Sequence, residues 1–461
     1  MGTRRLPVEL IDLCLRFLRE ERREEEADQG SNAIQDLKSS SLVSRQWRPL
    51  AQAHIFRSIY YLFTAIPRDI DNNEMMNFPV FSLPMNLGLF FAFVYRHPAI
   101  ASYIHTLSLR SDSLLCDRQR YPESEDGRAP EHNVYHGLLH EILTRLPQLR
   151  TLSLYNVLVY GAIIPEKRPS LQDLLLWFNG IYEAMYTVGD LRDLFATFSR
   201  IDTVSMINLQ PHGFHLSAPE EDMSPAPHRV EIRHLKLVDL EVHTPALLAR
   251  ALSLGVHVDK VRCLSLENFT VWGKHDPQAI IDVLSPGLYE LRFSVVQLEV
   301  ITKHPGMRQT ALFLMPTVFD ALPVVNCHTC SELRTLSILF NINPRADDEV
   351  WRTHTQNLCD FVEQSRISAA SHPHLRELAI CLSMQKTANI PASVREYVEP
   401  LDALLVALVR RSVLETVTFE WAVGNEGQEM LVGAEFEEFV HESFPTLRDN
   451  DMVSVRACDR K

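Results

Sequence analysis

Cys327 and Cys330 form the most closely spaced pair among the eight cysteines of the chain. A structural zinc site takes four ligands, so a Cys-x-x-Cys pair normally needs a second pair nearby. The next cysteines, Cys359 and Cys381, are each isolated in the sequence. A thioredoxin-like redox pair would lie between a strand and a helix, and this context is missing here. The pair therefore favours neither a metal centre nor a redox centre.

Motifs for phosphate binding and nucleophilic catalysis are missing from the chain. It has no Gly-x-Gly-x-x-Gly, Walker, Gly-x-Ser-x-Gly or His-Glu-x-x-His sequence. Only 16 residues are glycine, which disfavours backbone loops that cradle phosphates, and the 19 histidines are dispersed. We therefore predict a protein that is not an enzyme and that uses no cofactor and no metal.

The charge balance and the distribution of apolar residues exclude further classes. The chain has 45 Lys and Arg against 59 Asp and Glu, a net charge of −14, which opposes binding to nucleic acid. The most apolar window, 87–94, is too short to span a membrane and is predicted to be a buried helix. The scattered cysteines and the lack of a signal-peptide core predict an intracellular protein, cytoplasmic or nuclear.

A short phrase, apolar-x-x-apolar-x-apolar, recurs past residue 100. Its last three positions alternate with the period of a strand that buries one face, and its first residue fits a turn under that strand. The phrase occupies 104–109, 149–154, 171–176, 201–206, 232–237, 261–266, 288–293, 333–338, 375–380 and 414–419, with a degenerate member at 310–314. Helical patterns lie between the phrases, at 136–146, 191–198, 246–254 and 401–409.

Alternating strand, turn and helix resembles the unit of a leucine-rich-repeat solenoid. Asn156, Asn208 and Asn268 are partial matches to the asparagine that follows the strand in that family. The resemblance implies parallel strands that form a continuous concave sheet with outward positions facing a ligand. The alternative is a doubly wound α/β enzyme, which the many similar phrases and the missing glycine fingerprint disfavour.

The second place of the phrase repeatedly carries a long polar side chain. Such a row could hold acidic groups of a substrate through bidentate hydrogen bonds, or it could be a set of solubilising residues on turns. The residues are Arg150, Gln172, Arg233, Arg262, Arg334 and Arg376.

The first sixty residues predict a small helical module. Pro7 suits a first helical position, because its missing N–H would be unpaired there. Pro49 should end or kink the second helix. The first helix carries an apolar stripe at Leu10, Leu13, Cys14, Phe17 and Leu18, and the second carries Leu37, Leu42, Val43, Trp47 and Leu50. The charged segment 20–28 reads as a solvated helix end, followed by a loop at 29–32.

These residues resemble the F-box. The family pattern begins Leu-Pro-x-Glu and ends near Leu-Val-Ser-x-x-Trp, and the chain departs from it at 19–36, which lengthens the gap between the two halves. The matching residues are Leu6, Pro7, Glu9, Leu10, Leu42, Val43, Ser44 and Trp47. The run 54–57 is similar to the one that follows the motif in fungal members.

The resemblance implies that this module docks to the adaptor subunit of an SCF-type cullin–RING ubiquitin ligase, and through it to the cullin. Leu6, Pro7, Glu9, Leu10, Leu42, Val43 and Trp47 would form the contact. The region behind it would bind a target protein through residues that remain unknown. The alternative is a stand-alone leucine-rich-repeat scaffold whose N-terminal helices only cap the array.

The predicted fold class is α/β, with a small all-α F-box-like module followed by an irregular leucine-rich-repeat-like solenoid with parallel strands. The predicted domains are the module at 1–60, a helical connector at 61–100 and the array at 101–461.

Overall fold

The computed structural model describes residues 7–25, 32–45, 47–63, 87–111, 133–160, 167–177, 187–208, 224–238, 244–267, 277–295, 327–342, 348–384, 394–421 and 432–457. The protein is α/β, and its described strands are joined into one twelve-stranded, all-parallel sheet and one two-stranded parallel sheet. The small sheet pairs β3 (Asn133–Tyr135) with β5 (Leu158–Tyr160).

The strands of the large sheet follow one another in chain order without a reversal. Their order is β1 (Ser58–Phe63), β2 (Thr106–Ser111), β4 (Thr151–Tyr155), β6 (Ser170–Trp177), β7 (Arg200–Ile207), β8 (Glu231–Val238), β9 (Cys263–Glu267), β10 (Glu290–Val295), β11 (Thr335–Ile342), β12 (Glu377–Met384), β13 (Thr416–Trp421) and β14 (Val453–Ala457). A doubly wound sheet reverses its strand order at a switch point, and this sheet has no such point among the described strands.

Helices connect most of the strands. They are α1 (Val8–Glu25), α2 (Asn32–Val43), α3 (Trp47–Ile55), α4 (Leu87–Arg96), α5 (Pro98–Ala101), α6 (His136–Thr144), α7 (Val188–Ala196), α8 (Thr244–Gly255), α9 (Gln278–Leu284), α10 (Asp348–Gln364), α11 (Val394–Arg411), α12 (Ala434–Ser443) and α13 (Pro445–Asp449), with 3₁₀ turns η5 (Val258–Lys260) and η6 (Ser285–Gly287). The predicted helices at 87–94, 136–146, 191–198, 246–254 and 401–409 are confirmed as α4, α6, α7, α8 and α11.

The chain divides into two compact units. Unit 1 is Met1–Asp202 and unit 2 is Thr203–Lys461, so the division falls within β7. The predicted boundaries near residues 60 and 100 stay predictions. The range 61–100, expected as a helical connector, contains the end of β1 as well as α4 and α5.

The ten predicted strands are confirmed, and they explain why the phrase recurs. Its alternating apolar residues are buried, as at Leu107 and Leu109 in β2 and at Val417 and Phe419 in β13. Burial of such side chains contributes about 1.5–3 kcal/mol each. The leading residue is buried before its strand at Ile104, Leu149, Val261, Leu288, Leu333, Leu375 and Leu414. The degenerate phrase at 310–314 and Asn268 lie outside the described residues.

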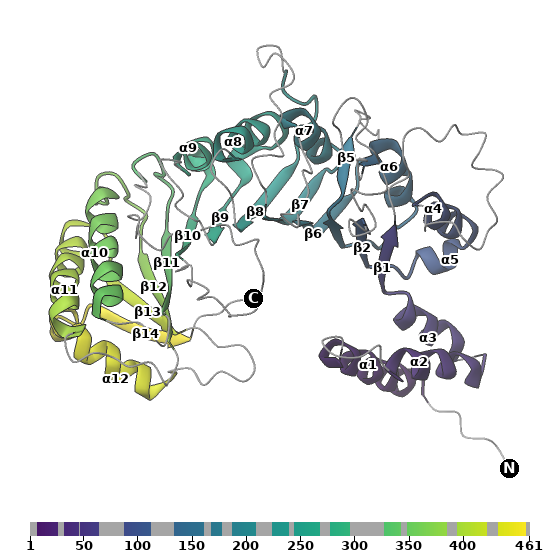
Figure 1. The fold of residues 1–461 in the computed structure, drawn as a ribbon, viewed down its shortest axis with the longest axis horizontal. Helices are drawn as coiled ribbons and strands as arrows, with labels where there is room; N and C mark the ends of the chain where they lie inside the picture. The colour runs from purple at the N-terminus through teal and green to yellow at the C-terminus, as the bar shows by residue number, and fades with distance from the viewer. Residues whose placement is uncertain are drawn as a thin grey trace, which may run out of the picture. The chain divides into compact units, whose positions relative to one another are not determined.

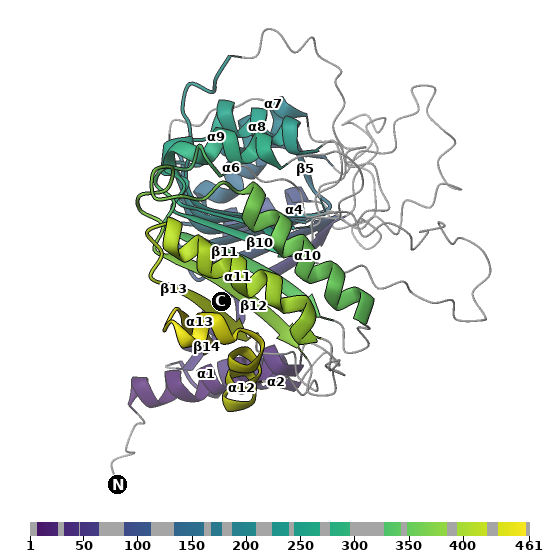
Figure 2. The same cartoon turned by 90° about the vertical axis from the view of Figure 1, so that its left-hand side faces the viewer.

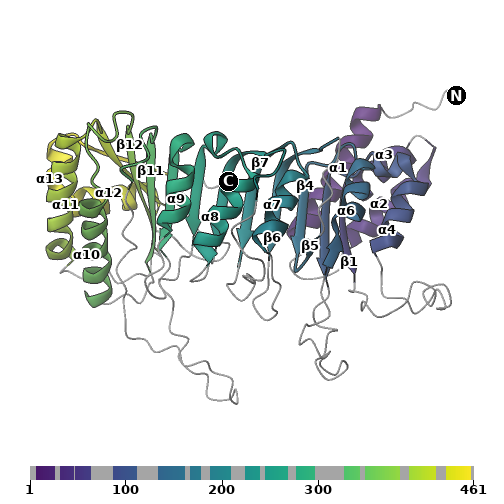
Figure 3. The same cartoon turned by 90° about the horizontal axis from the view of Figure 1, so that it is seen from above.

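The strands of unit 2 have one covered and one open face. Figure 1 shows α8, α9, α10 and α11 along the same face of β8–β13, and Figure 3 shows the same layering from above. Figure 2 shows α10 and α11 lying side by side, and α12 and α13 near β14. In unit 1, α6 lies against β3 and β5. We call the face of β8–β14 that is turned away from these helices the open face.

Three predictions for the second helix and its surroundings are wrong. The second helix was expected to run from Leu37 to Leu50, but α2 ends at Val43 and α3 begins at Trp47. Pro49 therefore neither ends nor kinks a helix, because it lies in the first turn of α3, where its missing N–H costs nothing. Asn32, expected in a loop, begins α2, since α1 already extends through the charged segment to Glu25.

Candidate functional site

The three N-terminal helices pack around a core of their own. Its buried residues are Ile11 and Leu15 of α1, Leu37 of α2 and Ala51 of α3. Trp47, Leu50 and Ile55 are partly buried and pack against this cluster. The lengthened α1 therefore still closes on α2 and α3, although the gap between the two halves of the F-box-like pattern is long. We call residues 7–55 of these helices the N-terminal module.

Two polar contacts hold the helices of the N-terminal module in register. His54 Nε2 lies 2.9 Å from Asp12 Oδ1, which ties α3 to α1, and His54 is buried. This hydrogen bond lowers the pKa of Asp12 below its usual value. Ser44 Oγ accepts a hydrogen bond from the backbone N–H of Trp47, the first residue of α3, at 3.2 Å.

The apolar stripe of α1 faces solvent rather than the core. Leu10 and Leu13 are 47% and 45% exposed, and Cys14 is also exposed. The buried residues Ile11 and Leu15 lie on a different side of the helix, because successive residues are rotated by about 100° on a helix of 3.6 residues per turn. The side chains of Phe17 and Leu18 lie outside the described residues.

The predicted docking residues fall into two groups in the structure. Pro7 and Glu9 are exposed like Leu10, and Pro7 directly precedes α1, so it is not the first helical residue. Leu42 and Val43, at the end of α2, are 77% and 64% exposed. Trp47 is not exposed in this way, because it packs against the core and is partly buried. Leu6 lies outside the described residues.

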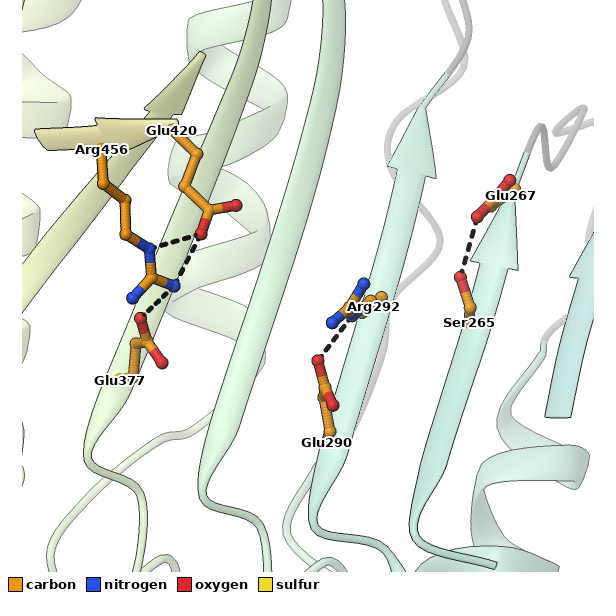
Figure 4. Close-up of polar contacts among 7 residues, drawn as sticks. All are labelled: Ser265, Glu267, Glu290, Arg292, Glu377, Glu420 and Arg456. Carbon is orange, nitrogen blue, oxygen red and sulfur yellow. Dashed lines mark hydrogen bonds and ion pairs between the residues drawn. The ribbon is translucent and has the colours of Figure 1, made fainter. Parts of the chain in front are cut away.

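The open face of unit 2 carries paired charges that sequence reasoning did not single out. Figure 4 shows Arg456 of β14 reaching Glu377 of β12 and Glu420 of β13. The Nη2 atom lies 2.6 Å from a carboxylate oxygen of each glutamate, and Nε lies 2.9 Å from Glu420 Oε1. One guanidinium group therefore joins three adjacent strands.

Two further carboxylates on the open face also have partners. Glu267 of β9 accepts a hydrogen bond from Ser265 Oγ at 3.1 Å and pairs with Lys236 Nζ of β8 at 2.9 Å. Glu290 of β10 pairs with Arg292, two residues along the same strand (Figure 4). This face is therefore an ionic surface whose acids are largely neutralised by their neighbours.

Burial makes Cys263, Cys327 and Cys330 of unit 2 poor nucleophiles. Burial, aided by the nearby Glu290 carboxylate, raises the pKa of Cys263 to about 12, and burial raises the pKa of Cys330 to about 11. Burial also raises the pKa of Cys327, whose carbonyl oxygen lies 2.8 Å from His372 Nε2. The Cys-x-x-Cys segment forms a turn with two buried cysteines, in which the Cys330 N–H donates to the Cys327 carbonyl at 2.8 Å.

Within the described residues, no group of three or more His, Cys, Asp or Glu side chains is placed to hold a metal ion. In the same part of the chain, no helix combines the length and the apolar character that crossing a bilayer requires.

The second-place residues of the phrase lie where the strands begin. Arg150, Gln172, Arg233, Arg334 and Arg376 are exposed, and Arg262 is partly buried. In several of them, the backbone carbonyl accepts two N–H groups from the next strand, as Arg150 does from Gln172 and Asp173 at 2.8 and 3.1 Å. Tyr289 occupies the same second place of the phrase, directly before β10. It was not grouped with the arginines because its side chain is aromatic.

No protein-family model matches the chain, and no curated protein is similar to it in sequence.

Proposed function

We propose that the protein is a substrate-recognition adaptor of an SCF-type cullin–RING ubiquitin ligase, as the F-box resemblance implies. The N-terminal module would dock to the adaptor subunit of the ligase, and the region behind it would hold a target protein. The benefit of such tethering is effective concentration, because the target is kept near a ubiquitin transfer carried out by other subunits.

The observation that carries this proposal is the exposure of apolar side chains on a module that has a buried core of its own. Leu10, Leu13, Leu42 and Val43 are between 45% and 77% exposed. Side chains of this kind favour a protein interface, in which buried apolar anchors supply most of the binding energy. We call these four residues the docking residues.

We also propose that the twelve-stranded sheet belongs to a leucine-rich-repeat-like solenoid. The support is the chain-order sequence of parallel strands and the residues that end two of them. Asn156 and Asn208 have φ angles of 53° and 55°, in the left-handed region where asparagine is tolerated. Their N–H groups donate to the carbonyls of Trp177 and Val238 on the neighbouring strands, at 2.8 and 3.0 Å.

The alternative is a scaffold in which the N-terminal helices serve as a cap. A cap buries an apolar face on the terminal repeat, because the first strand of an array has no preceding neighbour. Among the described residues, the buried cluster of the N-terminal module consists of residues of α1, α2 and α3, and the docking residues stay exposed. Docking accounts for these exposed side chains, whereas capping leaves them without a role.

Co-purification with the ligase adaptor subunit tests the proposal. The full chain should retain purified adaptor, and the double variant Leu10→Ser with Leu42→Ser should lose at least tenfold of this binding, because two apolar anchors are removed. A matched control is Leu89→Ser with Val413→Ser, which changes exposed apolar residues outside the module and should bind as the native chain does.

Circular dichroism should show that both double variants are folded. Retention of the adaptor by the Leu10/Leu42 variant at the native level would contradict the assignment of the docking residues. Failure of the native chain to retain any adaptor would contradict the function itself and favour the scaffold.

A further inference from the structure

Four arginines and one tyrosine lie side by side where five adjacent strands of unit 2 begin. The registers of β8 to β12 align His234 with Cys263, Glu290, Thr335 and Glu377 on successive strands. The residues directly before these are therefore neighbours as well. We call this set the arginine row, and its members are Arg233, Arg262, Tyr289, Arg334 and Arg376.

Backbone hydrogen bonds fix the spacing of the arginine row. The N–H groups of Arg262 and Tyr289 donate to the carbonyls of Arg233 and Arg262, at 2.7 and 2.8 Å. The N–H groups of Arg334 and Arg376 continue the series to Tyr289 and Arg334, at 2.8 and 2.9 Å. The side chains are thus presented at the interval of paired strands, about 4.8 Å.

Aromatic stacking orients two of the guanidinium groups. The Cζ atoms of Arg262 and Arg334 lie 4.3 and 4.7 Å from the centre of the Tyr289 ring. Arg262 Nη1 also donates to the Gly287 carbonyl at 3.0 Å. Stacking uses the flat face of a guanidinium group and leaves N–H donors at its edge for a planar anion. The pair is therefore partly ordered before any ligand binds.

Three members of the arginine row lack acidic partners of their own in the described part of the chain. Within the part of the chain that the structure describes, no carboxylate forms an ion pair with Arg262, Arg334 or Arg376. Glu290 and Glu377, the residues that follow Tyr289 and Arg376, are paired instead with Arg292 and Arg456. In a chain with a net charge of −14, a contiguous cationic row is not a consequence of composition.

We propose that the arginine row binds an extended acidic segment of the target protein through its carboxylates. This inference rests on the proposed function, in which the bound target is ubiquitinated by other subunits. It adds that the target must present acidic side chains. From Arg233 to Arg376 the row covers four strand intervals, about 19 Å, which an extended peptide spans with about six residues. Side chains on one face of such a peptide are about 6.6 Å apart, so acidic residues at alternate positions engage the row.

Fluorescence anisotropy with a labelled probe tests this inference without the ligase adaptor. The probe is an eight-residue peptide in which glutamate and serine alternate, and the control peptide has glutamine in place of each glutamate. The full chain should bind the acidic probe at least tenfold more tightly than the control. The affinity should fall at least fivefold between about 50 and 200 mM salt, since the contact is ionic.

Variants of the row locate the binding site. Arg334→Gln with Arg376→Gln should weaken binding of the acidic probe at least tenfold. The matched control, Arg96→Gln with Arg411→Gln, removes the same charge from exposed positions on α4 and α11 and should stay within twofold of the native chain. Arg334→Lys with Arg376→Lys keeps the charge but loses the planar fork, and should weaken binding about threefold to fivefold.

Three results would overturn the inference. They are equal binding of the acidic and glutamine peptides, equal losses in the row and control variants, and tighter binding of an eight-nucleotide thymidine probe than of the acidic peptide. Each of these results leaves retention of the ligase adaptor by the docking residues unaffected. Failure of the arginine row is thereby distinguished from failure of the proposed function.

Discussion

Residues of the F-box-like pattern differ in their exposure to solvent. Leu42 is 77% exposed at the end of α2, whereas Trp47 packs against the core of Ile11, Leu15, Leu37 and Ala51. A sequence pattern groups these two residues together because it records identity and spacing but not exposure. Their substitution should therefore separate binding from stability.

Trp47→Ala should destabilise the N-terminal module by about 1–3 kcal/mol, less than the loss for a fully buried tryptophan. Leu42→Ala should change its stability by less than about 0.5 kcal/mol, because it is exposed. Limited proteolysis combined with mass spectrometry would measure both effects, since cleavage within the module reports its opening. Equal protection of the two variants would contradict the placement of Trp47.

A buried histidine should make the stability of unit 2 depend on pH. His372 is fully buried, and burial lowers its pKa below the usual value of 6.5 despite the hydrogen bond to the Cys327 carbonyl. The unfolded chain, whose pKa is not lowered, then binds more protons than the folded chain below about pH 6.5. Stability is full above this pH and falls as the pH decreases through it, by at most about 1.4 kcal/mol per pH unit.

Urea unfolding of the native chain and of His372→Gln at pH 7.5 and 5.5 would measure this dependence. The variant loses hydrogen bonds and should be less stable at both pH values. Its stability should nevertheless change less between them, because glutamine does not titrate. A pH difference as large in the variant as in the native chain would show that other groups cause it.

At the scale of elements, one side chain of β14 adds ion pairs to the backbone pairing of this strand with β13. Arg456 joins β14 to Glu377 and Glu420 on the two strands before it. The side chain of Glu420 is only 11% exposed, so removal of its partner leaves a poorly solvated carboxylate. Arg456 is half exposed, which screens the interaction and reduces the expected cost.

Arg456→Met should destabilise unit 2 by about 1–2 kcal/mol and speed amide hydrogen exchange in β14. Glu420→Gln in the same chain should restore part of the loss, because it removes the unpaired charge. Arg448→Met is the control, since its pair with Asp449 is exposed and should contribute less than about 0.5 kcal/mol. Equal losses in Arg456→Met and Arg448→Met would refute the anchoring role.

Much of the order of strands and helices along the chain is predictable from the sequence, because each repeat buries apolar residues at the same alternating positions. The two outermost strands escaped prediction for different reasons. The strand β1 matches the apolar-x-x-apolar-x-apolar phrase at Phe56, Ile59 and Tyr61. These residues were assigned instead to the end of the F-box-like segment. In β14 the first place of the phrase is the polar Asn450, so only Val453 and Val455 carry the pattern.

The candidate site was less predictable than the fold. The network of Arg456 joins residues 79 positions apart in the sequence, since 456 − 377 = 79, and only strand register brings them together. Tyr289 holds the second place of the phrase 288–293, but only the pairing of β10 with β9 and β11 shows that it lies between Arg262 and Arg334. Three of the docking residues, Leu10, Leu42 and Val43, were predicted from a family resemblance, whereas Leu13 was predicted only as part of an apolar stripe. The exposure of all four depends on how the three helices pack.

At the scale of the whole molecule, the two proposed binding surfaces use different parts of the chain. The docking residues lie in unit 1, and the arginine row lies in unit 2. Because the proposed contacts use different residues, binding of the ligase adaptor and binding of an acidic peptide should be independent. The proposed function depends above all on direct binding of the N-terminal module to the adaptor subunit.

Isothermal titration of the full chain with purified SCF adaptor subunit tests that claim most directly. We expect one-to-one binding with a Kd below about 1 μM, equivalent to a binding free energy of about −8 kcal/mol, and a negative heat-capacity change from burial of the docking residues. Addition of the acidic peptide should leave this Kd unchanged. Absence of binding with both proteins folded at about 50 μM, where a Kd in that range would be saturated, would contradict the claim.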